Sequence, residues 1–289
     1  MHLKFARAAT LLSMSFVFCL SPAAQAAFRE KIVKLPVRVA GPDGTPYAQD
    51  ITLTMVYDDA RKKSPFLILN HGRSGDPKER KNYGRAVFKE QSRYFVERGF
   101  VVLMPTRIGY GVSAGPDLEN SGPCSNKDYP TSITVAVAQV KAAIGYAKAQ
   151  PEVDGSRGII LGQSVGGFTT IGAAAENIQG VKIAINFAGG AGGDPKNRPW
   201  NPCQSERIAQ TYGLYGAKAK VPTLWLYSAN DAYWGPDNPK KWVAAFTERG
   251  GKAEFVSLPA YGSDGHASFN GNPDAWKPPV EAFLKKHGF

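Results

Sequence analysis

The pattern of hydrophobic and polar residues changes once along this chain, near residue 66. Before that point, Lys31–Val39 and Asp50–Tyr57 alternate polar and apolar positions, and the segment Gly41-Pro42-Asp43-Gly44 lies between them. Alternation with a period of two on both sides of turn-forming residues is typical of two antiparallel strands. We therefore expect an N-terminal β-hairpin.

From Phe66 onward, short apolar runs alternate with longer segments of helical periodicity. The expected strands are Phe66–Asn70, Phe100–Met104, Gly158–Leu161, Val181–Phe187, Thr223–Tyr227 and Ala253–Leu258. The expected helices are Tyr83–Glu97, Ile133–Ala149, Gly167–Glu176, Lys240–Arg249 and Ala275–His287. This alternation favours a parallel sheet with helices on both faces. The chain thus predicts an α/β fold with a mostly parallel, eight-stranded sheet and an N-terminal antiparallel hairpin.

Two segments, 109–131 and 189–220, do not follow the alternation and are rich in Gly, Pro, Asn and aromatic residues. Each follows an expected strand, so both are expected as loops at the carboxyl edge of the sheet, where ligands usually bind. Cys124 lies in the first loop and Cys203 in the second.

Residues 1–26 have the pattern of a secretory signal peptide. A basic start is followed by an apolar centre, Leu11–Leu20, and by the small-residue site Ala24-Gln25-Ala26. We expect an exported protein, periplasmic or secreted, whose residues 27–289 form a single α/β domain. No later segment has about 18 uninterrupted apolar residues, so no stable membrane anchor is expected.

The two cysteines outside the signal segment, Cys124 and Cys203, predict a disulfide, because an even number of cysteines in an exported chain favours pairing. Two unpaired thiols are the alternative. No Cys or His pair has the spacing of metal ligands, so no metal site is predicted.

The formal net charge is +11, which could indicate a nucleic acid or an anionic surface as partner. The Lys and Arg residues are scattered, however, and no nucleic-acid-binding motif is present. The sequence therefore favours a basic exported protein with no nucleic-acid partner, and it leaves anionic substrates open.

The segment Gly162-Gln163-Ser164-Val165-Gly166 lies between an expected strand and an expected helix. A G-x-S-x-G sequence in this context forms a sharp turn that exposes the Ser hydroxyl as a nucleophile. By itself the motif is weak, because this chain has 31 glycines and an inert Ser in a glycine-rich turn is an alternative. A serine nucleophile needs a base, an acid and donors for an oxyanion.

His266 is the candidate base because it alone of the four histidines lies in a loop after the last expected strand. His2 lies in the signal segment, His287 lies near the end of the chain, and His71 directly follows a strand. The expected chain order is Ser, acid, His. His71 is expected to shape a loop.

Asp231 is the candidate acid because it leaves the carboxyl end of the strand Thr223–Tyr227. There it would accept a hydrogen bond from the imidazole and fix its tautomer. Asp237 and Asp264 are the rivals. Asp237 lies further along the loop, and Asp264 is too near His266 in sequence for an easy approach.

The candidate oxyanion donors are two backbone amides. One belongs to Val165, which follows the nucleophile. The other belongs to Arg73, in the loop after the first core strand, where Gly72 permits a close turn. Binding of a substrate carboxylate by the Arg73 guanidinium remains an alternative role.

The motifs around these residues resemble those of the α/β-hydrolase fold. The segments are GQSVGG around Ser164, YSAND around Asp231, GSDGH around His266, HGRSG at 71–75 and RIGYGVS at 107–113. The similarity extends over Phe66–Phe289 and is nearest to exported dienelactone hydrolase-like proteins. Dienelactone hydrolase itself uses a Cys nucleophile, whereas position 164 is Ser, so the resemblance implies a serine esterase more than a lactonase.

We therefore expect an exported serine hydrolase that cleaves a small-molecule carboxylic ester without any cofactor. Tyr110, Trp200, Tyr233 and Trp234 are candidates for an aromatic rim that binds substrate, although ordinary loop packing would also explain them. A peptidase or amidase is the first alternative, and a non-enzymatic binding protein the second. The sequence does not determine the oligomeric state.

Overall fold

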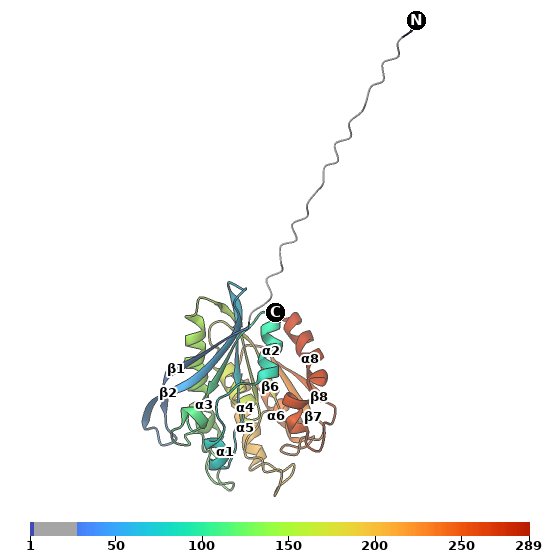
Figure 1. The fold of residues 1–289 in the computed structure, drawn as a ribbon. Coiled ribbons are helices and arrows are strands. Elements are labelled where there is room, and N and C mark those ends of the chain that lie inside the picture. Colours follow the sequence, from blue (N-terminus) through green and yellow to red (C-terminus); the bar gives the residue numbers. More distant parts are fainter. Residues whose placement is uncertain (3–27) are drawn as a thin grey trace.

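An eight-stranded sheet forms the centre of the computed structural model, which describes residues 1–2 and 28–289 (Figure 1). The spatial order of the strands is β1-β2-β4-β3-β5-β6-β7-β8. Their bounds are β1 Phe28–Ala40, β2 Pro46–Asp58, β3 Ser64–Asn70, β4 Val101–Thr106, β5 Val153–Gln163, β6 Val181–Phe187, β7 Thr223–Ser228 and β8 Ala253–Leu258. The β1–β2 and β2–β4 pairs are antiparallel, and all other pairs are parallel. The predicted fold class and hairpin are thus confirmed.

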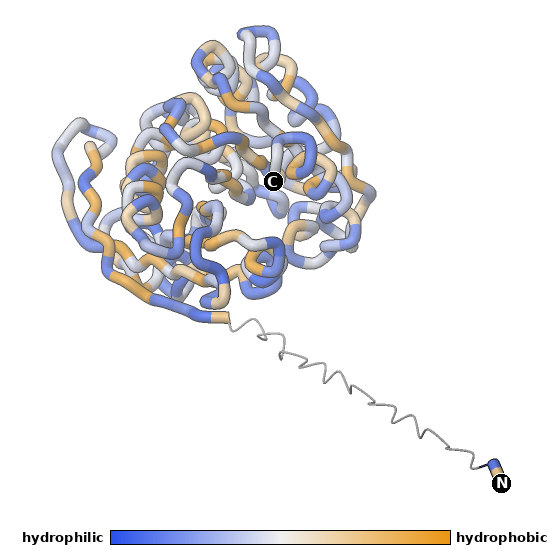
Figure 2. The backbone as a smooth tube through the Cα atoms, turned by 90° about the horizontal axis from the view of Figure 1, so that it is seen from above, coloured by the Kyte–Doolittle hydropathy of each residue, from blue (hydrophilic) through white to orange (hydrophobic). Residues whose placement is uncertain are grey.

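Helices cover both faces of the sheet (Figure 1). Their bounds are α1 Pro77–Lys81, α2 Lys89–Glu97, α3 Tyr129–Lys148, α4 Val165–Ala175, α5 Ser205–Gly216, α6 Asn238–Glu248, α7 Ser268–Gly271 and α8 Pro273–Lys286, with short 3-10 turns η1 Gly111–Ser113 and η2 Gly265–Ala267. Side chains of α3, α4, α5 and α6 share one hydrophobic core. Those of α2, α7 and α8 share the other. Hydrophobic and hydrophilic positions alternate along the folded chain, as expected when each element turns one side to the sheet (Figure 2).

The prediction of one helix over Tyr83–Glu97 was wrong at its start. Helix α2 begins only at Lys89, and a separate short helix, α1, precedes it. Gly84 has φ +73° and Phe88 has φ +42°, and this left-handed backbone interrupts a right-handed helix.

The prediction of a continuous loop over 189–220 was also wrong, because α5 lies within it. Its glycines suggested a loop, but they allow two helices to approach closely. A Cβ atom on Gly216 would lie 2.0 Å from the carbonyl oxygen of Phe246 in α6. Ile208 and Tyr212 of α5 are fully buried in the hydrophobic core that α5 shares with α3, α4 and α6.

The predicted signal peptide falls on residues outside the described part of the chain. Within the described part, none of the helices is long and apolar enough to cross a membrane. The parallel strands end at a common edge, at the bottom of Figure 1 where α1 is labelled. The candidate catalytic residues all follow the carboxyl ends of strands, so the topology gathers them at this edge.

Candidate active site

Ser164 occupies the sharp turn between β5 and α4. Its backbone has φ +59° and ψ −128°, a conformation that L-residues rarely adopt. Holding a non-glycine residue in such a conformation costs about 1–3 kcal/mol, and residues of this kind cluster at functional sites. The residue is 7% exposed and contributes to the wall of a cavity.

Both glycines of the pentapeptide are required by close backbone packing. A Cβ atom on Gly162 would lie 2.1 Å from the carbonyl oxygen of Gly166. One on Gly166 would lie 2.2 Å from the carbonyl oxygen of Asn70, at the end of β3. No side chain fits at these distances, so the glycines let the turn pack directly on the neighbouring strand.

Asp231 and His266 are in direct contact. The His266 Nδ1 lies 2.9 Å from the Asp231 Oδ2, and the Asp231 side chain is fully buried. The other carboxylate oxygen of Asp231 accepts hydrogen bonds from the amides of Tyr233 at 2.9 Å and Trp234 at 3.2 Å. The rings of these two residues also flank the imidazole, with that of Tyr233 stacked at 4.1 Å. The carboxylate is therefore fixed at both oxygens.

The two rival carboxylates have other partners. Asp264 accepts hydrogen bonds from the backbone amides of Ala232 and His266, both at 2.9 Å. Asp237 is exposed beside α6 and pairs with Lys240 at 3.4 Å. Asp231 is thus the carboxylate that meets the imidazole ring.

Two neighbours of Ser164, one in the chain and one in the cavity wall, contact His266. The Gln163 side chain donates to the His266 carbonyl oxygen at 3.2 Å. Tyr233 stacks on the His266 ring and lines the same cavity as Ser164. Among the described residues, no hydrogen bond joins the Ser164 hydroxyl to the His266 ring. Catalytic hydrogen bonds are often long without substrate and shorten only in the reacting complex.

One candidate donor amide follows Ser164 in the chain, and the other belongs to a loop that packs against the Ser164 turn. Val165 is the first residue of α4, and amides in the first turn of a helix have no carbonyl partner within that helix. Gly72 packs directly on the turn, because a Cβ atom there would lie 3.1 Å from the Cβ of Ser164. The loop that carries the Arg73 amide is therefore in contact with the nucleophile turn.

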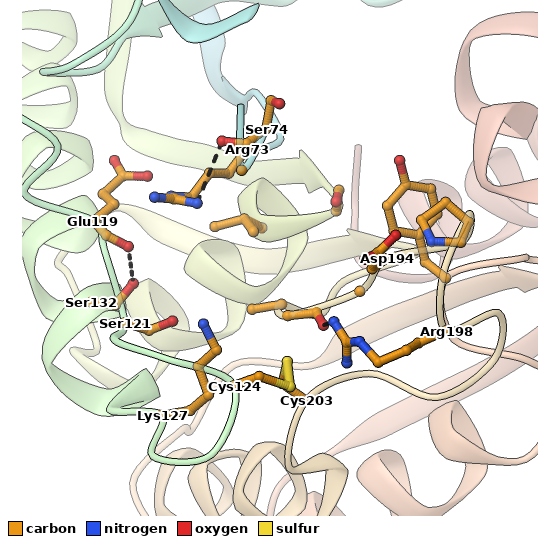
Figure 3. A pocket seen from close by; sticks show the side chains of 18 of the residues that line it. Arg73, Ser74, Glu119, Ser121, Cys124, Lys127, Ser132, Asp194, Arg198 and Cys203 are labelled. Carbon is orange, nitrogen blue, oxygen red and sulfur yellow. Dashed lines mark hydrogen bonds between the residues drawn. A yellow bond between two sulfur atoms is a disulfide. The ribbon is translucent and has the colours of Figure 1, made fainter. Parts of the chain in front are cut away.

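The Arg73 guanidinium forms an ion pair, at 2.5 Å, with Asp117, which is not one of the candidate catalytic residues. It also lines the cavity (Figure 3). The electrostatic partners of Arg73 include Asp117 and Glu119, which raise its pKa against the opposing effect of burial. Arg73 is therefore charged, and its alternative role in binding a substrate carboxylate stays a prediction.

Ser164 and Val165 line a cavity of about 490 Å³. Figure 3 shows this cavity from close by. The Cys124–Cys203 disulfide forms part of its wall, so the predicted pairing is present and its two loops meet where expected. Of the four candidate aromatic residues, Tyr233 and Trp234 line this cavity. Tyr110 is buried against His71 instead, and Trp200 is 60% exposed outside the lining.

Sequence reasoning missed two cations in the cavity, Lys127 and Arg198. Figure 3 shows both side chains beside the disulfide. Burial, together with the charges of Arg73 and Arg198, lowers the pKa of the Lys127 ammonium. Lys127 lies three residues after Cys124 and Arg198 lies five before Cys203. Proximity to the predicted disulfide was the signal that could have found them.

The sequence profile of the dienelactone hydrolase family matches residues 82–281, and the chain therefore belongs to that family. The protein is thus a hydrolase by family. No match is found among curated proteins.

Solved structures show the same fold. A protein assigned as a dienelactone hydrolase from Klebsiella pneumoniae subsp. pneumoniae MGH 78578 is similar with a TM-score of 0.59 and 17% identity, over 90% of this chain and 98% of that one. An acetyl xylan esterase from Paenibacillus sp. R4 gives 0.58 and 17%, over 91% and 89%. The acylaminoacyl peptidase of Pyrococcus horikoshii gives 0.60 and 14%, over 91% of this chain and 41% of that one.

Proposed function

We propose that the protein is an exported serine hydrolase that cleaves carboxylic esters through an acyl-enzyme. His266 takes the proton of the Ser164 hydroxyl as its oxygen attacks the ester carbonyl. The Val165 and Arg73 amides donate to the oxyanion of the tetrahedral intermediate. Collapse of the intermediate expels the alcohol, which receives the proton from His266. A water molecule deprotonated by His266 then releases the acid and restores Ser164.

The contact between His266 and Asp231 carries this proposal. With its Nδ1 donating to a buried carboxylate, the ring keeps Nε2 as its basic nitrogen. The carboxylate cannot rotate away, because two backbone amides hold its other oxygen. The imidazolium that forms during attack would thus face a fixed negative charge.

The identity of the nucleophile supports an esterase more than a dienelactone hydrolase in the strict sense. That enzyme uses a Cys nucleophile, whereas this chain has Ser164 in the strained turn. An alkoxide leaving group departs readily from a serine-derived tetrahedral intermediate, and the esterase neighbours share the fold. The disulfide and the N-terminal segment support export, since disulfides persist in oxidising compartments.

Turnover of short p-nitrophenyl esters beside aminoacyl-naphthylamides tests the proposal. We expect ester hydrolysis by the wild type and a loss of at least about 10³-fold in Ser164→Ala. Ser156→Ala is the matched control, because Ser156 is an exposed residue near the start of β5 whose hydroxyl donates only to Asp154 among the described side chains. Ester hydrolysis unchanged in Ser164→Ala would contradict the proposal. Faster turnover of the amides than of the esters would replace the esterase by a peptidase.

A further inference from the structure

We infer that His71 is a positioning residue for the oxyanion site. Together with Arg107 and Glu119, it fixes the Gly72–Arg73 peptide so that the Arg73 N–H is directed to the side of Ser164. This inference rests on the proposed function, since an oxyanion forms only if Ser164 attacks a carbonyl.

The hydrogen bonds of His71 select one neutral tautomer. The ring is fully buried, with Nδ1 2.7 Å from the Gly72 carbonyl oxygen and Nε2 3.1 Å from the Arg107 backbone nitrogen. A carbonyl oxygen only accepts and a backbone amide only donates. Nδ1 therefore carries the proton and Nε2 is bare. Burial and the positive charge of Arg107 hold the pKa of His71 well below its ordinary value, which keeps the ring neutral.

The Arg107 side chain fixes the same loop through two of its carbonyl oxygens. Its Nη1 donates to the His71 carbonyl oxygen at 2.8 Å, and its Nη2 lies 3.4 Å from the Gly72 carbonyl oxygen. Glu119 holds the guanidinium by two further hydrogen bonds, at 2.6 and 3.1 Å. Both charged side chains are at most 1% exposed. A buried guanidinium that is held by two hydrogen bonds to a carboxylate has little freedom to move, so it fixes the two successive carbonyl groups that it contacts.

The direction of the Arg73 amide follows from the planarity of the peptide bond. In a trans peptide the C=O and N–H groups point in opposite directions, and no cis bond occurs in the described chain. The Gly72 carbonyl points to the buried His71 and Arg107 side chains, so the Arg73 N–H points away from them. Gly72 packs against Ser164, and Arg73 lines the same cavity as Ser164. We infer that this is the side to which the Arg73 N–H points.

An oxyanion site benefits from this arrangement because its donors act only if they are already oriented when charge develops. Glycine at position 72 would otherwise leave its peptide group conformationally free. The His71 ring spans from the end of β3 to the residue after β4, and so it ties the loop to two adjacent strands of the sheet.

The test compares His71→Ala and His71→Asn in kcat and KM for p-nitrophenyl acetate and in inhibition by phenylboronic acid. We expect His71→Ala to lower kcat by about 10- to 100-fold, less than the ~10²–10³-fold loss for removal of an oxyanion donor. KM should change little, and boronate affinity should fall by a similar factor, because the boronate is tetrahedral and anionic when bound. His71→Asn should recover part of both losses, since its side-chain amide can donate from near the Nδ1 position.

His287→Ala is the matched control, because His287 packs on Phe283 at the end of α8. Its kcat should equal that of the wild type. A folded His71→Ala variant with unchanged kcat, or with a loss only in KM, would overturn the inference while leaving the serine hydrolase intact. A wild type without ester turnover would overturn both.

The geometry is also testable without substitution. Long-range ¹H–¹⁵N spectra of the wild type should show His71 with a protonated Nδ1 and a bare Nε2 at about pH 6.5, where an ordinary imidazole is half protonated. A ring that titrates near the ordinary value of about 6.5 would overturn the inference even if every variant were unstable.

Discussion

Breaking the Cys124–Cys203 disulfide removes the covalent link between two loops that are 79 residues apart in the sequence. Both half-cystines line the cavity in front of Ser164, and Cys203 is buried. The perturbation should therefore act on the stability of the fold and on the shape of the site.

The magnitude follows from the length of the closed loop. If the disulfide acts by restricting the unfolded chain, its contribution grows with the logarithm of loop length and reaches about 4.5 kcal/mol at 25 °C for this separation. Measured contributions are more often about 2–4 kcal/mol, because the unfolded chain keeps some structure. We expect the reduced protein to lose an amount in this range from its free energy of unfolding.

Urea unfolding followed by tryptophan fluorescence measures the loss, on oxidised protein and on reduced protein whose thiols have been alkylated. The Cys124→Ser/Cys203→Ser variant should unfold at the same urea concentration as the reduced protein. Before alkylation, intact mass should rise by two hydrogen atoms on reduction, which verifies the starting state. Equal midpoints for the oxidised and reduced forms would refute the reasoning, and so would an unchanged mass.

Three further predictions concern the catalytic residues and their surroundings. Gly166→Ala should abolish most ester turnover, because the added Cβ atom would lie 2.2 Å from the Asn70 carbonyl oxygen and displace the nucleophile turn. A kcat comparable to that of the wild type would contradict this prediction. Asp231→Asn should lower kcat about 10³- to 10⁴-fold, because the His266 ring loses its fixed tautomer. Stopped-flow or steady-state assays measure the loss, and an unchanged melting temperature is the control. A loss of tenfold or less would contradict the role of Asp231. The pKa of His71 is lowered in the folded state, so below about pH 6.5 the unfolded chain binds a proton that the folded chain does not. The free energy of unfolding should therefore fall as the pH decreases, by up to about 1.4 kcal/mol per pH unit. That contribution is complete above about pH 6.5, and urea midpoints across pH 5–8 should show the slope in the wild type but not in His71→Asn.

The order of strands and most helices could be predicted because their signals are local. Runs such as Phe66–Asn70 are buried on both faces and carry no polar residue before Asn70. Helix α5 could not be predicted in the same way, because its glycines matter only through contact with α6. The start of α2 depends on left-handed backbone at Phe88, a residue whose type gives no warning of it.

The candidate catalytic residues could be named from the sequence because their positions after expected strands identify them. Ser164, Asp231 and His266 follow strands whose carboxyl ends the topology must bring together. The role of His71 in its loop depends on Arg107 and Glu119. Glu119 meets Arg107 only through the folded conformation of the 109–131 segment, which the sequence pattern does not reveal. Lys127 and Arg198 enter the cavity for the same reason, through loops whose conformation has no periodic signal.

The central claim is that Ser164 is the acylated nucleophile, and covalent labelling tests it most directly. A fluorophosphonate probe should react with the folded protein, and tandem mass spectrometry of the digest should place the adduct on Ser164. Labelling should vanish in Ser164→Ala and persist in Ser156→Ala. Folded wild-type protein that takes up no probe, or that carries the adduct on another residue, would contradict the account.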